Sequence, residues 1–144
     1  MYGILNISEA TTLAVHAMTF LAAQDPDRPV STKEIAEIMA VSDNHLSKVV
    51  QRLVRAGLAR AQRGPKGGVL LARDSKDISL LEVYEAIEGR LEITKCLLKT
   101  RLCKPGECIF GDLLPKITGE VKDYMEKTHL SDLKHVFAGV KLAS

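Results

Sequence analysis

The sequence predicts a mostly α-helical protein that contains one small β-hairpin. Apolar residues recur at helical spacing in four segments of the first 89 residues. A basic, glycine-rich stretch over residues 58–73 interrupts this spacing, as expected of two short strands joined by a turn. The last third of the chain has the 4, 3, 4, 3 apolar spacing of a long helix that packs against another helix.

Composition and charge limit the class of protein. Hydrophobic residues make up 46% of the 144 residues, which is ordinary for a globular protein, and no apolar run reaches the about 18 residues that a membrane helix needs. Without a basic, then apolar, N-terminal segment to indicate secretion, we expect a cytoplasmic protein with reduced thiols and no membrane partner. Eight Lys or Arg and three acidic residues lie between Ser42 and Asp77, which favours a polyanionic partner at one face, although a solvated basic surface is the alternative.

Three helices are expected before the hairpin. Asn6 and Glu9 have the spacing of a capping box, and a first helix should run from there to about Gln24, ahead of the prolines of "DPDRP". Ser31 and Glu34 repeat that spacing and open a short second helix. A third helix should begin after Ser42 and stop near Gly57. Its apolar stripe consists of Leu46, Val49, Val50, Leu53 and Val54.

The hairpin and the later helices follow from the same signals. The tip "RGPKGG" should join two short strands. A fourth helix is expected between the N-cap Ser79, paired with Glu82, and the stop at Gly89. Pro115 should lie in the first turn of the long helix, and "THLSDLKHVF" suggests a final short helix. The long helix has the apolar positions Phe110, Leu114, Ile117, Val121 and Tyr124.

Two short helices joined by the tight turn "AVS" and followed by a basic hairpin are typical of a winged helix-turn-helix domain. Asn, Gln and Arg can read base edges in the major groove, and a basic wing tip can lie along the minor groove. We therefore expect double-stranded DNA as the partner, with protein docking as the alternative use of such a module. No nucleotide-binding or Ser–His–Asp motif is present, which argues against an enzyme or a small-molecule substrate. The candidate DNA-binding residues are Ser42, Asn44, His45, Ser47, Lys48, Gln51, Arg52, Arg63 and Lys66.

All three cysteines lie in "CLLKTRLCKPGEC", at Cys96, Cys103 and Cys108. Thiolates favour zinc or iron–sulfur clusters, and the wide C-x₆-C-x₄-C spacing suits a cluster better than a zinc knuckle. The cations Lys95, Lys99, Arg101 and Lys104 should lower the thiol pKa values and offset the charge of an anionic cluster. From the residues alone, a cluster, a zinc site, a thiol redox switch and inert cysteines all stay open.

The order of these features resembles the IscR/NsrR/RirA/CymR family of bacterial winged-helix repressors, the Rrf-two family. The resemblance rests on "EIAEIMAVSDNHLSKVVQRLVRAGL", on the wing "RGPKGGVLLAR", on "SLLEVYEAIEG", and on the three cysteines and the long helix. It implies a homodimer built on that helix, a recognition helix that starts near Ser42, and a 2Fe–2S or 4Fe–4S cluster on the cysteines. By analogy, Asn44, His45, Ser47 and Lys48 would face the major groove and Arg63 the minor groove. The expected division is a winged helix-turn-helix domain (residues 1–89), a cysteine-rich cluster loop (residues 90–109), and a dimerisation helix with its tail (residues 110–144).

The fourth cluster ligand is the part of this pattern that the resemblance leaves open. The best-known cluster-assembly regulators of the family have a His three residues after the third cysteine, where this chain has Gly111. Other relatives take a ligand from the first helix of the partner subunit, which makes His16 or Glu9 a candidate. Asp112, near Cys108, is the third candidate ligand. For each of the three candidates, the alternative is an ordinary structural role without a cluster.

The function expected from sequence is a cluster-dependent transcriptional repressor that senses iron, redox state or nitric oxide. One alternative is a cluster-free winged-helix regulator that responds through cysteine oxidation or a protein partner. Another is an iron–sulfur carrier whose helices serve only as a scaffold, although the basic hairpin argues against it.

Overall fold

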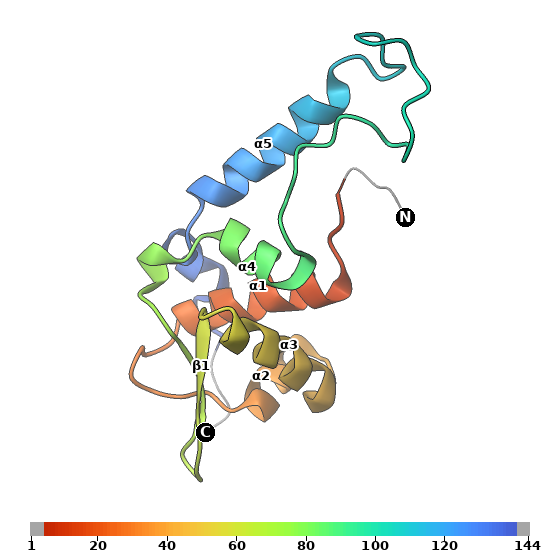
Figure 1. Cartoon of the computed structure of the whole chain (residues 1–144). Coiled ribbons are helices and arrows are strands. Elements are labelled where there is room, and N and C mark those ends of the chain that lie inside the picture. The colour runs from red at the N-terminus through yellow and green to blue at the C-terminus, as the bar shows by residue number, and fades with distance from the viewer. Residues whose placement is uncertain (1–4, 141–144) are drawn as a thin grey trace.

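The computed structural model describes residues 5–140 and confirms a mostly helical fold with one two-stranded hairpin (Figure 1). A compact body contains the hairpin and all helices but one, and α5 extends away from it. The chain between α4 and α5 loops around the far end of α5. The elements in order are α1 (Glu9–Ala22), α2 (Thr32–Met39), α3 (Asp43–Arg55), β1 (Ala59–Gln62), β2 (Gly68–Leu71), the 3₁₀ helix η1 (Ser75–Asp77), α4 (Leu80–Glu88), α5 (Leu113–Lys127) and the 3₁₀ helix η2 (Leu130–Phe137).

The start of α1 differs from the prediction. The helix is capped by Ser8, whose hydroxyl accepts a hydrogen bond from the backbone N–H of Thr11, so the capping box at Asn6 and Glu9 was wrong. The Ser8 hydroxyl also donates to the carboxylate of Glu88 on α4. A contact with a distant residue therefore contributes to fixing this helix start, and sequence spacing does not reveal such contacts.

The helix-turn-helix pair α2–α3 begins where the sequence predicts. Ser31 and Ser42 are the N-caps, and their hydroxyls accept from the N–H groups of Glu34 and His45. The chain turns between the helices at Ala40, which has a left-handed backbone with φ of 56°. The predicted stripe of α3 faces the core: Leu46, Val49, Val50 and Leu53 are buried, and Val54 is half-buried.

The wing is anchored to the body by a backbone pairing that precedes α2. Strands β1 and β2 are antiparallel, with Arg60 opposite Leu70. Val30, just before α2, forms a bridge with Val69 on β2 through two hydrogen bonds of 3.1 and 2.7 Å. A Cβ at Gly68 would lie 2.5 Å from the carbonyl carbon and oxygen of Val30, so this close approach requires glycine.

Helix α5 is joined to the body at α4 and at η2. The predicted capping box of α4 is confirmed at Ser79 and Glu82, and Pro115 lies in the first turn of α5 as predicted. A small apolar cluster, separate from the main core, joins the two helices. It consists of Leu81, Tyr84 and Leu91, with Val121 and Met125 packed against them.

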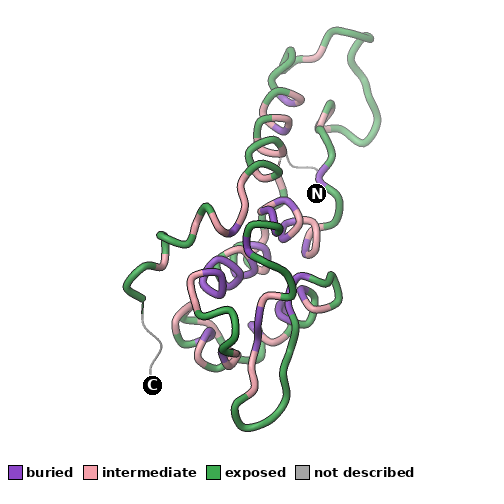
Figure 2. Tube along the Cα trace, turned by 90° about the vertical axis from the view of Figure 1, so that its left-hand side faces the viewer, coloured by how far each residue is buried: buried purple, intermediate pink, exposed green. Residues whose placement is uncertain are grey.

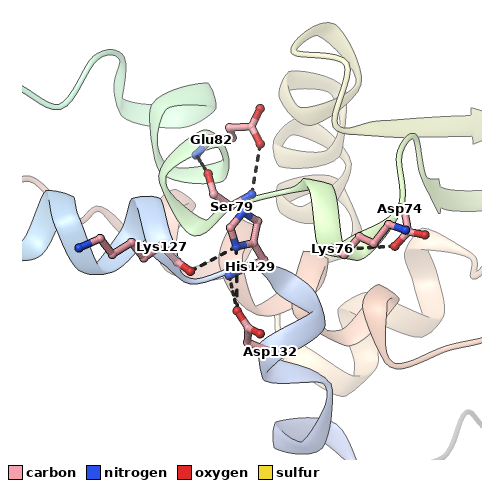
Figure 3. A network of polar contacts seen from close by, with 7 residues as sticks. All are labelled: Asp74, Lys76, Ser79, Glu82, Lys127, His129 and Asp132. Carbon is pink, nitrogen blue, oxygen red and sulfur yellow. Dashed lines mark hydrogen bonds and ion pairs between the residues drawn. The ribbon is translucent and has the colours of Figure 1, made fainter.

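The chain after α5 returns to the winged-helix body. His129 pairs with Ser79 in an isolated bridge, and its backbone N–H donates to Asp132 at 2.9 Å (Figure 3). Leu130 is fully buried in the main core, and the ring of Phe137 meets that of Phe20 edge-on at 5.8 Å. The predicted final short helix is therefore the 3₁₀ helix η2, and it packs on α1 although the sequence grouped it with the dimerisation helix.

Burial follows this division of the molecule. Figure 2 shows buried residues gathered in the body and a mostly exposed loop at the far end of α5. The main core is aliphatic apart from Phe20 and includes side chains from α1, α2, α3, both strands and η2. Among residues 5–140, no helix has both the length and the hydropathy to cross a membrane.

Candidate nucleic-acid interface and cysteine segment

The N-terminal half of α3 presents polar side chains to solvent. Ser42, Asn44 and Lys48 are exposed, and His45 and Ser47 are half-buried. Opposite them, the apolar stripe anchors α3 to the core, so the helix offers a rigid polar face. A rigid helix with amide, hydroxyl and ammonium groups along one face has the donors that base edges and phosphates accept.

The wing tip adds two exposed cations, Arg63 and Lys66. The tip closes through a 2.9 Å hydrogen bond from the N–H of Gly67 to the carbonyl of Gly64, and Gly64 has a φ of +108°. A groove of about 550 Å³ lies between the tip and the start of α2. That groove is lined by Asp27, Arg28, Pro29, Ser31, Glu34, Pro65, Lys66 and Gly67.

Arg52 differs from the other candidate DNA-binding residues of α3. Its guanidinium donates a hydrogen bond to the backbone carbonyl of Ile87 in the last turn of α4. Arg52 is exposed, as is its neighbour Gln51, so the hydrogen bond to Ile87 is what distinguishes Arg52. The structure therefore directs Arg52 toward the body of the protein.

Arg52 also lies beside a cluster that the sequence did not reveal. The Glu88 carboxylate accepts hydrogen bonds from the hydroxyls of Ser8 and Thr11, the latter at 2.5 Å. Partial burial raises the pKa of Glu88, but those hydrogen bonds and the positive charge of Arg52 outweigh it and hold the pKa below its ordinary value. Because Thr11 and Glu88 are 77 positions apart, no local pattern predicts this contact.

The three cysteines share one small pocket in the segment between α4 and α5. All three are free thiols, and the pocket of about 20 Å³ is also lined by Lys95, Arg101, Lys104 and Glu107. The backbone N–H groups of Leu98 and Phe110 donate to the sulfurs of Cys96 and Cys108, each at 3.4 Å. Backbone N–H groups and cationic side chains therefore surround the sulfur atoms.

This arrangement brings the thiols together without forming a finished metal site. Within residues 5–140, no three His, Cys, Asp or Glu side chains are close enough to hold a single metal ion. The donor set nevertheless fits an anionic iron–sulfur cluster, because three soft ligands and three cations line one pocket. A cluster also spreads its ligands over several iron atoms, so it requires less convergence than one ion.

None of the three candidates for a fourth ligand lines this pocket in the described chain. Asp112 is exposed at the N-cap of α5, and its side chain makes no capping hydrogen bond. Glu9 is exposed in the first turn of α1. His16 is exposed on the same helix, where Nδ1 lies 2.5 Å from the carbonyl oxygen of Thr12 and the ring meets Phe137 edge-on at 6.5 Å.

Comparison with known proteins agrees with this architecture. A family model described as "Rrf2: Iron-dependent Transcriptional regulator" matches residues 7–135. The chain is 35% identical over 92 residues to the HTH-type transcriptional regulator NsrR of Bacillus subtilis, which covers 64% of this chain and 63% of that protein. It is 31% identical over 130 residues to the HTH-type transcriptional regulator IscR of Photobacterium profundum, and this match covers 90% of this chain and 75% of that protein. The solved structure of CymR, the global cysteine regulator of B. subtilis, is similar to this chain, with a TM-score of 0.79 and 27% sequence identity. The match covers 92% of this chain and 98% of the CymR chain.

Proposed function

Because the chain belongs to the Rrf2 family of transcriptional regulators, we propose that it is a homodimeric repressor whose DNA binding depends on an iron–sulfur cluster. The observation that carries the cluster proposal is the shared pocket of Cys96, Cys103 and Cys108. The thiolates would hold the cluster, while Lys95, Arg101 and Lys104 offset its negative charge. When bound, the cluster would supply sensitivity to iron supply, redox state or nitric oxide.

The proposed DNA contacts come from α3 and the wing. Asn44, His45, Ser47 and Lys48 would enter the major groove, since they lie near the N-terminal end of a helix whose other face is buried. Arg63 and Lys66, at the exposed wing tip, would reach the adjacent minor groove or its phosphates. Two such units in a dimer would meet half-sites about 34 Å apart on one face of the operator.

The proposed fourth ligand comes from the partner subunit. Asp112 follows Cys108 closely but lies outside the pocket, and Glu9 and His16 are exposed on α1. The exposure of His16 leaves its Nε2 available to bind a cluster held by the other subunit, since Nδ1 faces the Thr12 carbonyl. An imidazole or carboxylate binds such a cluster more weakly than a thiolate, so this bond would be the one that a signal breaks first.

Anaerobic reconstitution of the purified protein tests the cluster proposal. Wild-type protein should bind iron and sulfide in stoichiometric amounts and absorb visible light, and Cys103→Ala should lose both. Leu102→Ala, which changes the exposed neighbour, is the matched control and should keep them. Stoichiometric iron and sulfide in Cys103→Ala would contradict the proposed site.

A salt titration of operator binding tests the proposed wing contact. Arg63→Ala should weaken binding and lower the slope of log affinity against log salt by about one. An unchanged slope would place the contact elsewhere.

The lifetime of the cluster tests the proposed fourth ligand. A shorter lifetime in His16→Ala, but not in Asp112→Ala, would identify His16 as the ligand from the partner subunit.

A cluster-free thiol switch is the second candidate function. It is favoured by the three free thiols that line one pocket, because neighbouring thiols can be oxidised to a disulfide. Protein that contains three titratable thiols but no iron or sulfide after anaerobic purification, and that changes operator affinity on oxidation, would support it. An iron–sulfur carrier, in contrast, should show no sequence-specific DNA binding.

A further inference from the structure

A hydrogen bond joins the last turns of α3 and α4, two helices that also share the main core. Arg52 lies in the last turn of α3, and its guanidinium donates to the Ile87 carbonyl in the last turn of α4. The last carbonyls of a helix lack partners within the helix and carry the negative end of its dipole. Since α4 has no basic residue in its own last turn, Arg52 supplies the cation from another helix.

The same end of α4 also holds the start of α1. Glu88 accepts hydrogen bonds from the hydroxyl of Ser8, which caps α1, and from that of Thr11, which is buried. The positive charge of Arg52 acts on the same carboxylate. One helix end therefore joins the last turn of the proposed recognition helix to the first turn of α1.

The chain that leaves this helix end is held at successive points until the first cysteine. The N–H of Leu91 donates to the Glu85 carboxylate at 2.7 Å, and the Leu91 side chain is buried in the apolar cluster between α4 and α5. The N–H of Thr94 donates to the hydroxyl of Thr118 on α5 at 3.0 Å. Cys96 follows two residues later, so few residues separate it from a held position.

We infer that Arg52 is a positioning residue that couples the cysteine segment (residues 90–112) to the recognition helix, and that it does not contact DNA. The inference rests on the proposed function, because it assigns a route by which the state of the cysteines reaches the DNA-binding face. A displacement of the chain near Cys96 would act on the end of α4 through Leu91. Through its hydrogen bond to Ile87, Arg52 would transmit this displacement to the last turn of α3. The other end of α3 carries the proposed base-reading residues.

Operator binding by cluster-loaded and cluster-free protein tests the inference. In Arg52→Gln, the ratio of the two affinities should fall at least threefold toward one, while the salt slope stays unchanged. Arg52→Lys should restore most of the ratio, because an ammonium can also donate to the Ile87 carbonyl. Arg55→Gln is the matched control, since Arg55 is an exposed cation in the same turn, and it should leave the ratio as in the wild type.

A lowered salt slope in Arg52→Gln, with the affinity ratio preserved, would identify a phosphate contact and overturn the inference. If wild-type protein binds no cluster, the proposed function fails, and hydrogen exchange of the cluster-free protein then decides on Arg52 separately. Arg52→Gln, but not Arg55→Gln, should speed exchange in residues 85–94. Equal exchange in both variants would overturn the coupling.

Discussion

The winged-helix body and the cysteine segment (residues 90–112) use apolar residues in opposite ways. In the body, Leu46 and Leu53 on α3 are 0% and 1% exposed. In the segment, Leu102 and Ile109 are 79% and 87% exposed. The same kinds of side chain therefore stabilise one region through burial and leave the other without a core of its own.

Backbone hydrogen bonding separates the two regions as well. The body consists of capped helices and a hairpin, whereas the segment has no helix or strand among its described residues. Its held positions are near its beginning, at Leu91 and Thr94. Under the proposed function, a region that gathers thiols around one ligand can remain open in the single chain, but a helix that presents a fixed face to DNA cannot.

The largest expected difference between the regions is the effect of removing a leucine side chain. Leu53→Ala should lower the free energy of unfolding by about 2–5 kcal/mol, because it leaves a cavity in the core. Leu102→Ala should change it by less than about 0.5 kcal/mol. Urea unfolding of both variants measures this, and equal losses of stability would remove the distinction.

Glycine replacement should show the next largest difference. Gly68→Ala places a Cβ 2.5 Å from the Val30 backbone at a φ of +157°, and should cost about 2–4 kcal/mol and weaken operator binding. Gly106→Ala, in the cysteine segment, meets only the backbone strain of a φ of +81° and should cost about 1–2 kcal/mol. If Gly68→Ala were the milder change in thermal unfolding, the wing would not be anchored by Val30.

Removing the Thr118 hydroxyl, which accepts from the Thr94 N–H and donates to the Leu114 carbonyl, should loosen the cysteine segment with a smaller effect on the body. Thr118→Val keeps the shape of a buried side chain but leaves the Thr94 N–H without its acceptor, at a cost of about 1–2 kcal/mol. Hydrogen exchange should accelerate at Thr94. The control Thr100→Val changes an exposed residue, and its exchange rate at Thr94 should match that of the wild type. An unaltered exchange rate at Thr94 in Thr118→Val would show that the hydrogen bond to Thr118 does not hold the segment.

The smallest expected effect concerns pH. Since the pKa of Glu88 is held below its ordinary value, its ionised form stabilises the fold above that ordinary value, and the contribution is lost as pH falls through the lowered pKa. Glu88→Gln should therefore be less stable than wild type at neutral pH by up to about 1 kcal/mol, and the difference should shrink in acid. Unfolding measured across pH checks this, with the exposed Glu92→Gln as control; a difference that grew in acid would contradict the assignment.

Features with a local cause were predictable from the sequence. The N-caps at Ser31, Ser42 and Ser79 depend on hydrogen bonds to residues three positions ahead, so spacing reveals them. The hairpin is local for the same reason. The start of α1 was placed wrongly at Asn6, because Ser8 is also fixed by Glu88 from a distant part of the chain.

For the candidate site, the sequence located the three cysteines and the polar face of α3. It did not predict that Arg52 would point to α4, since a polar residue on an amphipathic helix has the same spacing whether it meets solvent, DNA or another helix. The bridge from Val30 to the wing was equally hidden, because it joins backbone groups 39 positions apart in the sequence.

The sequence by itself determined the order of helices and wing, the polar face of α3 and the set of three thiols. These depend on periodicity, capping and residue type, which act over a few positions of the chain. Only the tertiary structure decided that the thiols share one cationic pocket, that η2 packs on α1, and that the end of α4 joins α1 and α3. The physical reason is that such contacts depend on how whole elements pack, and packing of distant segments leaves no local pattern.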